Sequence, residues 1–325
     1  MKEAQVDVDA NVALHAVPIP QLQDPHHILI KVIVSGCNPK DWKMPADRVA
    51  ALHQLGAPHG SYAEYSLVLD HVVFHIGDRS FEEAAAILMA YYMASIGLFG
   101  MLGMPTTWQN HAQNHTSRDW ATPLVIYGAS GAVGSAAVQL AQSAHLHPLI
   151  CIAGASGKAV VEPLIDNSKG DVLIDYREGA EEVVEQMRNA LYGYELCCAS
   201  DCASEKGASA NICQVLRPGG RISLVLPSGV KDVPSGFETS TTMIGGLWAG
   251  FNNKTGAHGA MRFDGGREFG YCYSALIGYW FREGRLHVQK PEVVESGLLG
   301  VEKALKSLRE GKNRGVKYVE TPGLM

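Results

Sequence analysis

The stretch from Pro123 to Ala141, PLVIYGASGAVGSAAVQLA, constrains the fold of this 325-residue chain more than any other part. The apolar run Leu124–Tyr127 predicts a buried strand. Glycines at 128, 131 and 134 follow, and small, apolar residues then predict a helix. This order predicts a dinucleotide site, because a pyrophosphate binds backbone N–H groups at a helix N-terminus. Gly131 would let the backbone approach the ligand, and Gly134 would let the helix pack on the strand. A tight strand–helix turn without a ligand is the alternative interpretation.

Strand and helix patterns alternate after this turn. Apolar runs predict strands at 147–152, 172–174, 195–201 and 221–226. The segments between them predict helices at 157–167, 181–191 and 206–216. Such alternation is typical of an α/β fold with a doubly wound parallel sheet.

The two ends of the chain have different patterns. The first third has strand signals at 6–17, 27–34 and 61–68, and a helix is predicted over Phe81–Leu102. The last part has helix signals around 271–283 and 298–310. A closing strand at 315–320 is expected to rejoin the first domain. A chain of this length can form two domains with separate cores.

The composition excludes several classes of protein. Apolar residues make up 46% and charged residues 18%, which is typical of an ordinary globular protein. A formal net charge of −6 gives no reason to expect nucleic-acid binding. The most apolar stretch, Ala84–Leu102, is interrupted by tyrosines and glycines, so a core helix is expected rather than a membrane span. The first residues, MKEAQVDVD, contain acids and no apolar core, so we expect a cytoplasmic protein without a signal peptide.

The seven cysteines do not predict a metal site. They show no paired CxxC spacing, whereas a structural zinc site needs four ligands at short intervals. His111 and His115 lie in a polar stretch without nearby acidic partners, which is more typical of a solvated loop. We therefore expect no metal, and most of the cysteines are expected to be buried thiols.

Five motifs together carry a resemblance to a known family. They are SGCNPKDWK at 35–43, DRVAAL with GSYAEY at 47–65, VIYGASGAVG at 125–134, LRPGGRI at 216–222 and the closing GVKYV. The chain resembles the zinc-independent branch of the medium-chain dehydrogenase/reductase superfamily, and in particular fungal trans-acting enoyl reductases and quinone-oxidoreductase-like proteins. The resemblance implies a Rossmann-type sheet and a GroES-like β-rich catalytic domain. It places the catalytic domain at 1–90, the NADP-binding domain at 91–250, and at 251–325 a segment that completes the Rossmann sheet and returns to the catalytic domain.

One departure from the family pattern falls after Pro45. The family has a G-x-D-x-x-G block and two barrel strands at this point, whereas here Pro45 runs directly into Ala46-Asp47-Arg48-Val49. We therefore expect a truncated barrel, arising either from gene loss or from splicing. The cleft would be more open or completed by a second subunit, because unpaired strand edges are usually covered. A homodimer is the expected assembly.

The resemblance assigns cofactor contacts to several parts of the chain. It implies that Asn38, Pro39 and Asp41 line the nicotinamide end, although these residues also suit a type I turn. The pyrophosphate contacts would be Ser130, Gly131, Ala132, Val133 and Gly134. The remaining assignments are Tyr176 at the adenine, the backbone of Val225 and Leu226 at the nicotinamide, and Lys317, which is otherwise a strand-edge lysine.

Ser156 and Lys158 indicate which nicotinamide cofactor is used. They follow the second predicted strand of the nucleotide domain, where the adenosine ribose is recognised. An acidic residue there would favour NAD. A hydroxyl and a cation favour a 2′-phosphate, so NADPH is the predicted cofactor.

The reaction implied by the resemblance is reduction of an activated C=C bond in an enone or polyketide-like substrate, with a synthase as a partner. The nicotinamide supplies the hydride and the protein supplies orientation and a dry cleft. Lys43, Tyr62, Tyr91 or water could give the proton, and Tyr62 could equally be a core ring. Two alternatives stay open, namely a redox-neutral isomerase, epimerase or cyclase on the same fold, and a cofactor-binding partner protein without catalysis.

Overall fold

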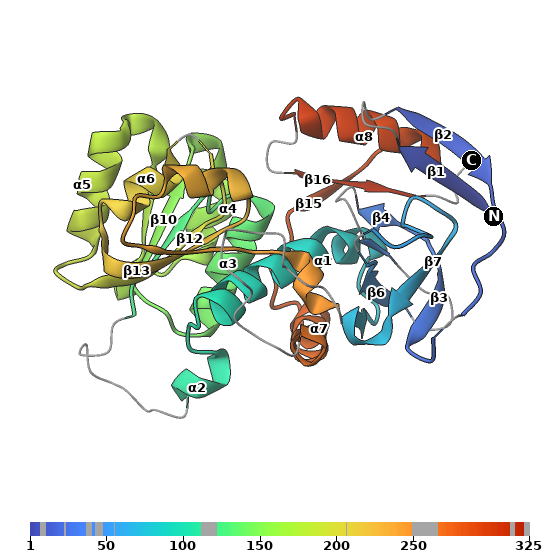
Figure 1. The fold of residues 1–325 in the computed structure, drawn as a ribbon, viewed down its shortest axis with the longest axis horizontal. Coiled ribbons are helices and arrows are strands. Elements are labelled where there is room, and N and C mark those ends of the chain that lie inside the picture. The colour runs from blue at the N-terminus through green and yellow to red at the C-terminus, as the bar shows by residue number, and fades with distance from the viewer. Residues whose placement is uncertain are drawn as a thin grey trace. The chain divides into compact units, whose positions relative to one another are not determined.

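The computed structural model describes residues 1–6, 11–22, 24–36, 41–42, 48–54, 56–111, 122–205, 207–248, 266–312 and 316–321. The chain divides into two compact units. The first unit contains residues 1–92, 245–250 and 265–325, and the second contains 93–244 and 251–264. Figure 1 labels many elements of the two units, and each unit is considered separately below.

The second unit is built on a six-stranded parallel sheet. The strands lie in the order β11-β10-β9-β12-β13-β14 and pair in parallel throughout. Numbered along the chain this order is 3-2-1-4-5-6, which is the order of the dinucleotide-binding doubly wound fold. The predicted Rossmann-type sheet is therefore confirmed. The strands are β9 (Leu124–Tyr127), β10 (Leu149–Ala153), β11 (Val172–Asp175), β12 (Leu196–Asp201), β13 (Leu216–Leu224) and β14 (Glu238–Thr241).

Helices cover this sheet and explain its apolar strands. Every residue of β9 and β10 is buried, as expected for parallel strands packed on both faces. Helix α5 presents Val183, Val184 and Met187 to a core that also contains residues of β9, β10, β12 and β13. The helices are α3 (Ala132–Ser143), α4 (Lys158–Val161), α5 (Ala180–Ala190) and α6 (Ala208–Cys213), all visible in Figure 1.

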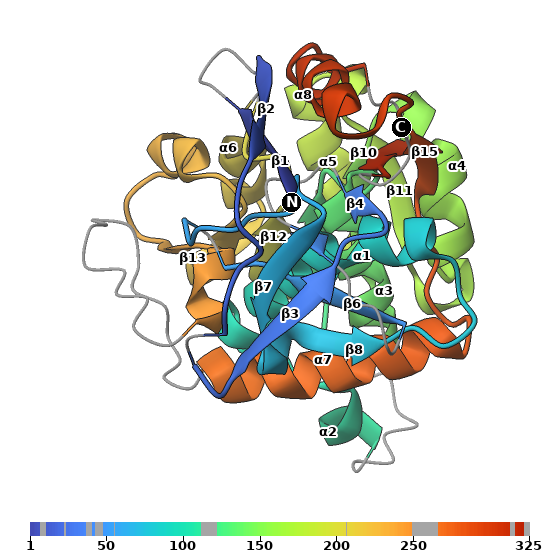
Figure 2. The same cartoon turned by 90° about the vertical axis from the view of Figure 1, so that its right-hand side faces the viewer.

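The first unit is rich in short strands, as predicted. Its sheets are β1-β2, β3-β7, β5-β6-β8 and β15-β16-β4 among the residues described. Figure 2 shows β3 and β7 side by side, with helix α7 running past β8. The strands are β1 (Lys2–Val6), β2 (Val12–Ala16), β3 (His27–Lys31), β4 (Ser35–Gly36), β5 (Asp41–Trp42), β6 (Val49–Leu52), β7 (Tyr65–Leu69), β8 (Val73–His75), β15 (Lys290–Val293) and β16 (Val316–Glu320), and the helices are α7 (Gly266–Arg282) and α8 (Gly300–Arg309).

Three sequence-based expectations about the elements are wrong. The segment 251–325 was expected to complete the Rossmann sheet, but its described strands β15 and β16 pair with each other and with β4 of the first unit. Its return to the first unit is correct. Within the strand expected at 6–17, the described strand β2 covers only Val12–Ala16, and it pairs antiparallel with β1 (Lys2–Val6). The helix expected at 157–167 is a single α-turn, because Pro163 lacks an N–H and the chain continues as 3-10 turns.

The long apolar helix has the bounds that its sequence predicts. Helix α1 (Phe81–Ser95) continues as a π-helix, Ile96–Met101, and the short helix α2 (Thr107–His111) follows. By length and composition Phe81–Met101 could cross a membrane, whereas the tyrosines and glycines in its sequence predict a core helix. However, 78% of its most apolar window is buried in protein, which is typical of a core helix.

The expected barrel truncation concerns residues outside the described part of the chain. The junction at Pro45–Ala46 falls in the undescribed range 43–47. The described strands on either side, β5 and β6, pair antiparallel through Asp41 with Leu52 and Trp42 with Ala51. The truncation therefore stays a prediction.

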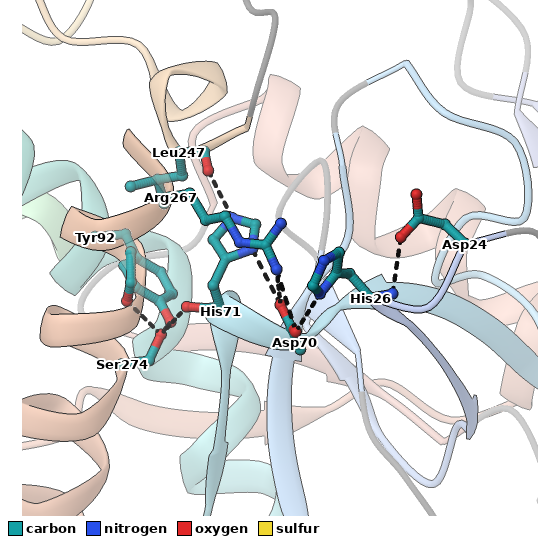
Figure 3. A network of polar contacts seen from close by, with 9 residues as sticks. Asp24, His26, Asp70, His71, Tyr92, Leu247, Arg267 and Ser274 are labelled. Atoms are coloured by element: carbon teal, nitrogen blue, oxygen red, sulfur yellow. Dashed lines mark hydrogen bonds and ion pairs between the residues drawn. The ribbon is translucent and has the colours of Figure 1, made fainter. Parts of the chain in front are cut away.

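A buried histidine joins three segments of the first unit (Figure 3). The His71 Nε2 atom donates a hydrogen bond to the carbonyl of Leu247 at 2.6 Å. Beside it, the Asp70 carboxylate accepts from His26 Nδ1 at 2.9 Å and from Arg267 Nη2 at 3.1 Å. The Ser274 hydroxyl of α7 contacts the Tyr92 hydroxyl and lies 2.8 Å from the His71 carbonyl. Burial lowers the pKa of His71, so its ring is neutral at pH 7.

This arrangement predicts an acid-sensitive contribution to stability. A histidine whose pKa is lowered by folding stabilises the folded state at high pH, and that contribution is lost as the pH falls below its unfolded value of about 6.5. Gln at position 71 would keep an N–H donor for Leu247 without titrating. We expect His71→Gln to reduce the decline in unfolding free energy between pH 7 and pH 5, measured by urea denaturation. His75→Gln, at an exposed histidine of the same unit, is the control. An unchanged decline in His71→Gln would contradict the assignment.

Candidate cofactor-binding site

The turn between β9 and α3 has the backbone that its glycines predict. Gly128 has φ +76°, and a Cβ there would lie 3.0 Å from the amide nitrogen of Ala203. A Cβ on Gly134 would lie 2.1 Å from the carbonyl oxygen of Gly128, closer than any real contact. Only glycine therefore lets the first turn of α3 pack against the end of β9, as the sequence predicted.

The N-terminus of α3 offers free amides to a ligand. Its N-cap is Gly131, which provides no side-chain acceptor. The amides of Ala132, Val133 and Gly134 have no acceptor inside the helix, because the first turn lacks preceding carbonyls. Among the described residues a Cβ on Gly131 would meet only the Gly128 carbonyl, at 3.3 Å, so little protein lies beside this first position of the turn. The turn thus fits a pyrophosphate, which the positive end of the helix dipole would attract.

Two further glycines allow close contacts between the ends of β9, β10 and β11. A Cβ on Gly157 would lie 2.3 Å from the Cβ of Ser130, in the glycine-rich turn itself. A Cβ on Gly154 would lie 3.0 Å from the ring of Tyr176, which follows β11 and is 39% exposed. The ends of β9, β10 and β11 are therefore joined through glycine contacts.

The residues predicted to select the cofactor lie on this edge. Ser156 and Lys158 follow β10, and both are exposed. The Lys158 ammonium lies 3.3 Å from a Glu162 carboxylate oxygen, one turn further along. Both partners are more than half exposed, so the pair is weak and leaves the cation available to a phosphate.

A fixed arginine beside Tyr176 was not predicted from the sequence. The Arg177 guanidinium donates from Nε to Asp175 Oδ1 at 3.0 Å and from Nη2 to Asp175 Oδ2 at 2.6 Å. These bonds lower the pKa of Asp175 and raise that of Arg177. The carboxylate therefore holds the guanidinium at the end of β11 with one side exposed to solvent.

The loop after β12 is organised by a buried carboxylate, Asp201. It accepts from the amides of Ala203 at 3.1 Å and Ser204 at 2.6 Å and from the Ser209 hydroxyl at 2.6 Å. Burial raises the pKa of Asp201, although these three donors oppose the shift. This loop faces the glycine-rich turn across the point where the strand order reverses, which is where ligands bind in open α/β sheets.

Val225 and Leu226 are fixed by the same loop. The Val225 amide donates to the Asp201 carbonyl at 3.1 Å, and the Leu226 amide donates to the Ser204 hydroxyl at 3.2 Å. Leu226 is 43% exposed. Sequence analysis identified these two residues but missed Asp201 and Ser204. The only sequence signal for them was that the segment DCAS (201–204) directly follows an apolar run.

The residues predicted from the first unit have different surroundings. Tyr62 packs against Val294, Ala304 and Tyr318 in a small core. Tyr91 is buried in α1. Lys317 is 8% exposed and lies in β16, the central strand of its sheet, so a strand-edge position is wrong. Their roles in catalysis or cofactor binding stay predictions.

The predicted nicotinamide-end residues are only partly described. Asp41 lies in β5, where its backbone pairs with Leu52. Asn38, Pro39 and Lys43 lie outside the described residues. The predicted residues that the structure brings to one sheet edge are those of the second unit: Ser130, Gly131, Ala132, Val133, Gly134, Ser156, Lys158, Tyr176, Val225 and Leu226.

Comparison with known proteins gives consistent results. No family model matches the chain. The chain is 34% identical to the trans-enoyl reductase fsr4 of Gibberella fujikuroi over 328 aligned residues, covering 90% of each protein. It is 26% identical to the trans-enoyl reductase resD of Aspergillus sclerotiorum, covering 94% of this chain and 95% of that protein. Among solved structures, CurK enoyl reductase superimposes with a TM-score of 0.69 at 15% identity, over 98% of both chains, which confirms the fold.

Two substitutions separate a ligand role of the glycine-rich turn from a packing role. Gly131→Val adds a side chain in front of the free amides at a position with φ −68°, so the fold should survive while dinucleotide binding is lost. Gly134→Val should instead force α3 away from β9 and lower stability by about 3 kcal/mol. Fluorescence titration and urea unfolding measure the two effects. Normal cofactor binding by Gly131→Val would show that the motif is only a structural turn.

Proposed function

Because the chain belongs to the trans-enoyl reductases, a family of medium-chain dehydrogenase/reductases, we propose that it reduces an activated C=C bond with a nicotinamide cofactor. The observation that carries this proposal is the open amide cradle at the N-terminus of α3, at the switch point of a 3-2-1-4-5-6 sheet. The nicotinamide cofactor supplies the hydride, and the protein binds and orients the reactants.

NADPH is the proposed form of the cofactor. Ser156 offers a hydroxyl and Lys158 a cation after β10, and both are exposed. Neither residue is acidic, so a ribose 2′-phosphate would gain charge-assisted hydrogen bonds there. Arg177 adds a second cation at the end of β11, held by Asp175.

The second unit would hold the cofactor in extended form along one edge of the sheet. The amides of Ala132, Val133 and Gly134 would bind the pyrophosphate, and the Tyr176 ring would flank the adenine. Hydrogen bonds from the 201–204 loop fix the backbone at Val225 and Leu226, where the nicotinamide end is expected. This rigidity would favour hydride transfer by holding the reactive ring in one orientation.

We propose an α,β-unsaturated thioester or enone of polyketide type as the substrate, delivered by a separate synthase. The family membership supports this class of substrate. Lys43, Tyr62 and Tyr91 stay the candidate proton donors, and the burial of Tyr91 and the packing of the partly buried Tyr62 ring against a small core favour Lys43 or water.

Cofactor preference gives a direct test of this function. We expect oxidation of NADPH, followed at 340 nm, with a short trans-2-enoyl thioester and much slower oxidation of NADH. Lys158→Ala should weaken NADPH binding by about 1.5–3 kcal/mol, roughly 10- to 150-fold, and leave NADH binding unchanged.

Lys169→Ala provides the matched control, because Lys169 is an exposed lysine of the same unit that precedes β11 and lies near Asp166. Its NADPH affinity should equal that of the parent protein. Equal affinities of the parent protein for NADPH and NADH would contradict the choice of NADPH, and absence of turnover with either cofactor would contradict the reductase activity.

A further inference from the structure

One residue of the loop after β12 holds a strained backbone conformation in the interior of the second unit. Ser204 has φ +52°, in the left-handed region that residues other than glycine rarely adopt. It is 3% exposed. The other described residues with positive φ that are not glycine are exposed or half-buried, namely His59, His145, Tyr192 and Ser296. Strained residues persist where their surroundings hold them, and they concentrate at functional sites.

The polar groups of Ser204 connect two strand ends. Its amide donates to Asp201 Oδ1 at 2.6 Å. Its hydroxyl donates to the Asp201 carbonyl at 3.2 Å and accepts from the Leu226 amide at 3.2 Å. A hydroxyl has one donor and two acceptor sites, so both bonds can form together. The side chain therefore joins the end of β12 to the chain that follows β13, its neighbour in the sheet (Figure 1).

The turn that follows Leu226 packs against the same residue. This turn is the 3-10 segment η8 (Pro227–Asp232). A Cβ on Gly229 would lie 3.1 Å from the Ser204 Cβ, and the Ser228 hydroxyl lies 3.5 Å from the Ser204 carbonyl. The hydrogen bond to the Leu226 amide and this close contact together fix the backbone after β13.

The backbone conformation alone does not explain why residue 204 is a serine. Glycine adopts positive φ without steric cost, and asparagine adopts it more readily than serine does. What serine adds is a hydroxyl on a short side chain, and this hydroxyl is the acceptor of the Leu226 amide. A strained serine is therefore expected where the hydroxyl, rather than the turn itself, is required.

We propose that Ser204 is a positioning residue for hydride transfer, because its hydroxyl holds the Leu226 backbone in the orientation that fixes the nicotinamide ring. This role rests on the proposed function, which places the nicotinamide end at Val225 and Leu226. Hydride transfer requires reacting carbons about 3–3.5 Å apart and aligned, so a small rotation of the ring slows transfer more than it weakens binding. Ser204 itself does not need to touch the reacting atoms.

Amide hydrogen exchange of the protein without cofactor tests the hydrogen bond itself. Ser204→Ala removes the acceptor and keeps the Cβ, so the Leu226 amide should exchange at least tenfold faster, measured by NMR. The Val225 amide, which donates to the Asp201 carbonyl at 3.1 Å, should keep its protection. Ser228→Ala is the matched control, because Ser228 is exposed and lies near Ser204 without binding Leu226. An unchanged exchange rate of Leu226 in Ser204→Ala would overturn the proposal, whatever the activity of the chain.

Steady-state kinetics test the consequence for the reaction. With NADPH and a trans-2-enoyl thioester, Ser204→Ala should lower kcat about tenfold and leave the dissociation constant of NADPH nearly unchanged, because the adenine and pyrophosphate contacts are retained. Ser228→Ala should keep the parental kcat. A parent chain without turnover would overturn the proposed function and this role with it. An active parent chain with an equally active Ser204→Ala variant would overturn the positioning role alone.

Ser204→Gly separates the hydroxyl from the backbone strain. Glycine adopts φ +52° without steric cost, so the urea midpoint of Ser204→Gly should lie above that of Ser204→Ala. Both variants lack the hydroxyl, so the loss of kcat in Ser204→Gly should be at least as large as in Ser204→Ala. If kcat instead followed stability, with Ser204→Gly close to the parent chain, Ser204 would have only a structural role and the proposal would be wrong.

Discussion

The close packing of α3 on the end of β9 is the contact on which the candidate site depends. The missing side chain of Gly134 lets the first helical turn reach the Gly128 carbonyl, and a Cβ would come within 2.1 Å of that oxygen. This packing aims the free amides of Ala132, Val133 and Gly134 at the edge where the strand order reverses. Gly157 packs in the same way against Ser130 of this turn, and Gly154 lets the Tyr176 ring at the end of β11 approach the end of β10. Close backbone contact, rather than any catalytic side chain, thus creates the anion-binding surface.

The other half of the edge depends on a buried charge. Asp201 loses hydration but gains three hydrogen bonds, and those bonds set the backbone of the 201–204 loop. The loop in turn binds the amide of Val225 and, through the Ser204 hydroxyl, that of Leu226. A carboxylate therefore positions the expected nicotinamide end without needing to contact the cofactor. Reactivity would come from the bound cofactor and from the substrate it meets.

The sequence predicted those parts of the molecule that local pattern determines. The strand, turn and helix from Leu124 to Ser143 and the βαβ alternation after them follow from apolar periodicity and glycine spacing. Asp201 and Arg177 were missed because their hydrogen bonds, to Ser209 and to Asp175, form only in the folded loops and leave no pattern in the sequence. The helix at Lys158–Val161 is only one turn long because of Pro163. Apolar periodicity alone does not show that this proline ends the helix. The pairing of β15 and β16 with β4 could not be predicted, because strand partners far apart in sequence leave no local signal.

The central claim is that the edge of the second unit binds a nicotinamide cofactor that delivers hydride to a C=C bond. Its most direct test is isotope transfer from NADPH deuterated at C4, using the two C4 epimers in turn, to a trans-2-enoyl thioester, with the product analysed by mass spectrometry and NMR. The account predicts one deuterium at the β-carbon from one epimer and none from the other. A saturated product without deuterium from either epimer, or an isomerised product formed without loss of NADPH, would contradict it.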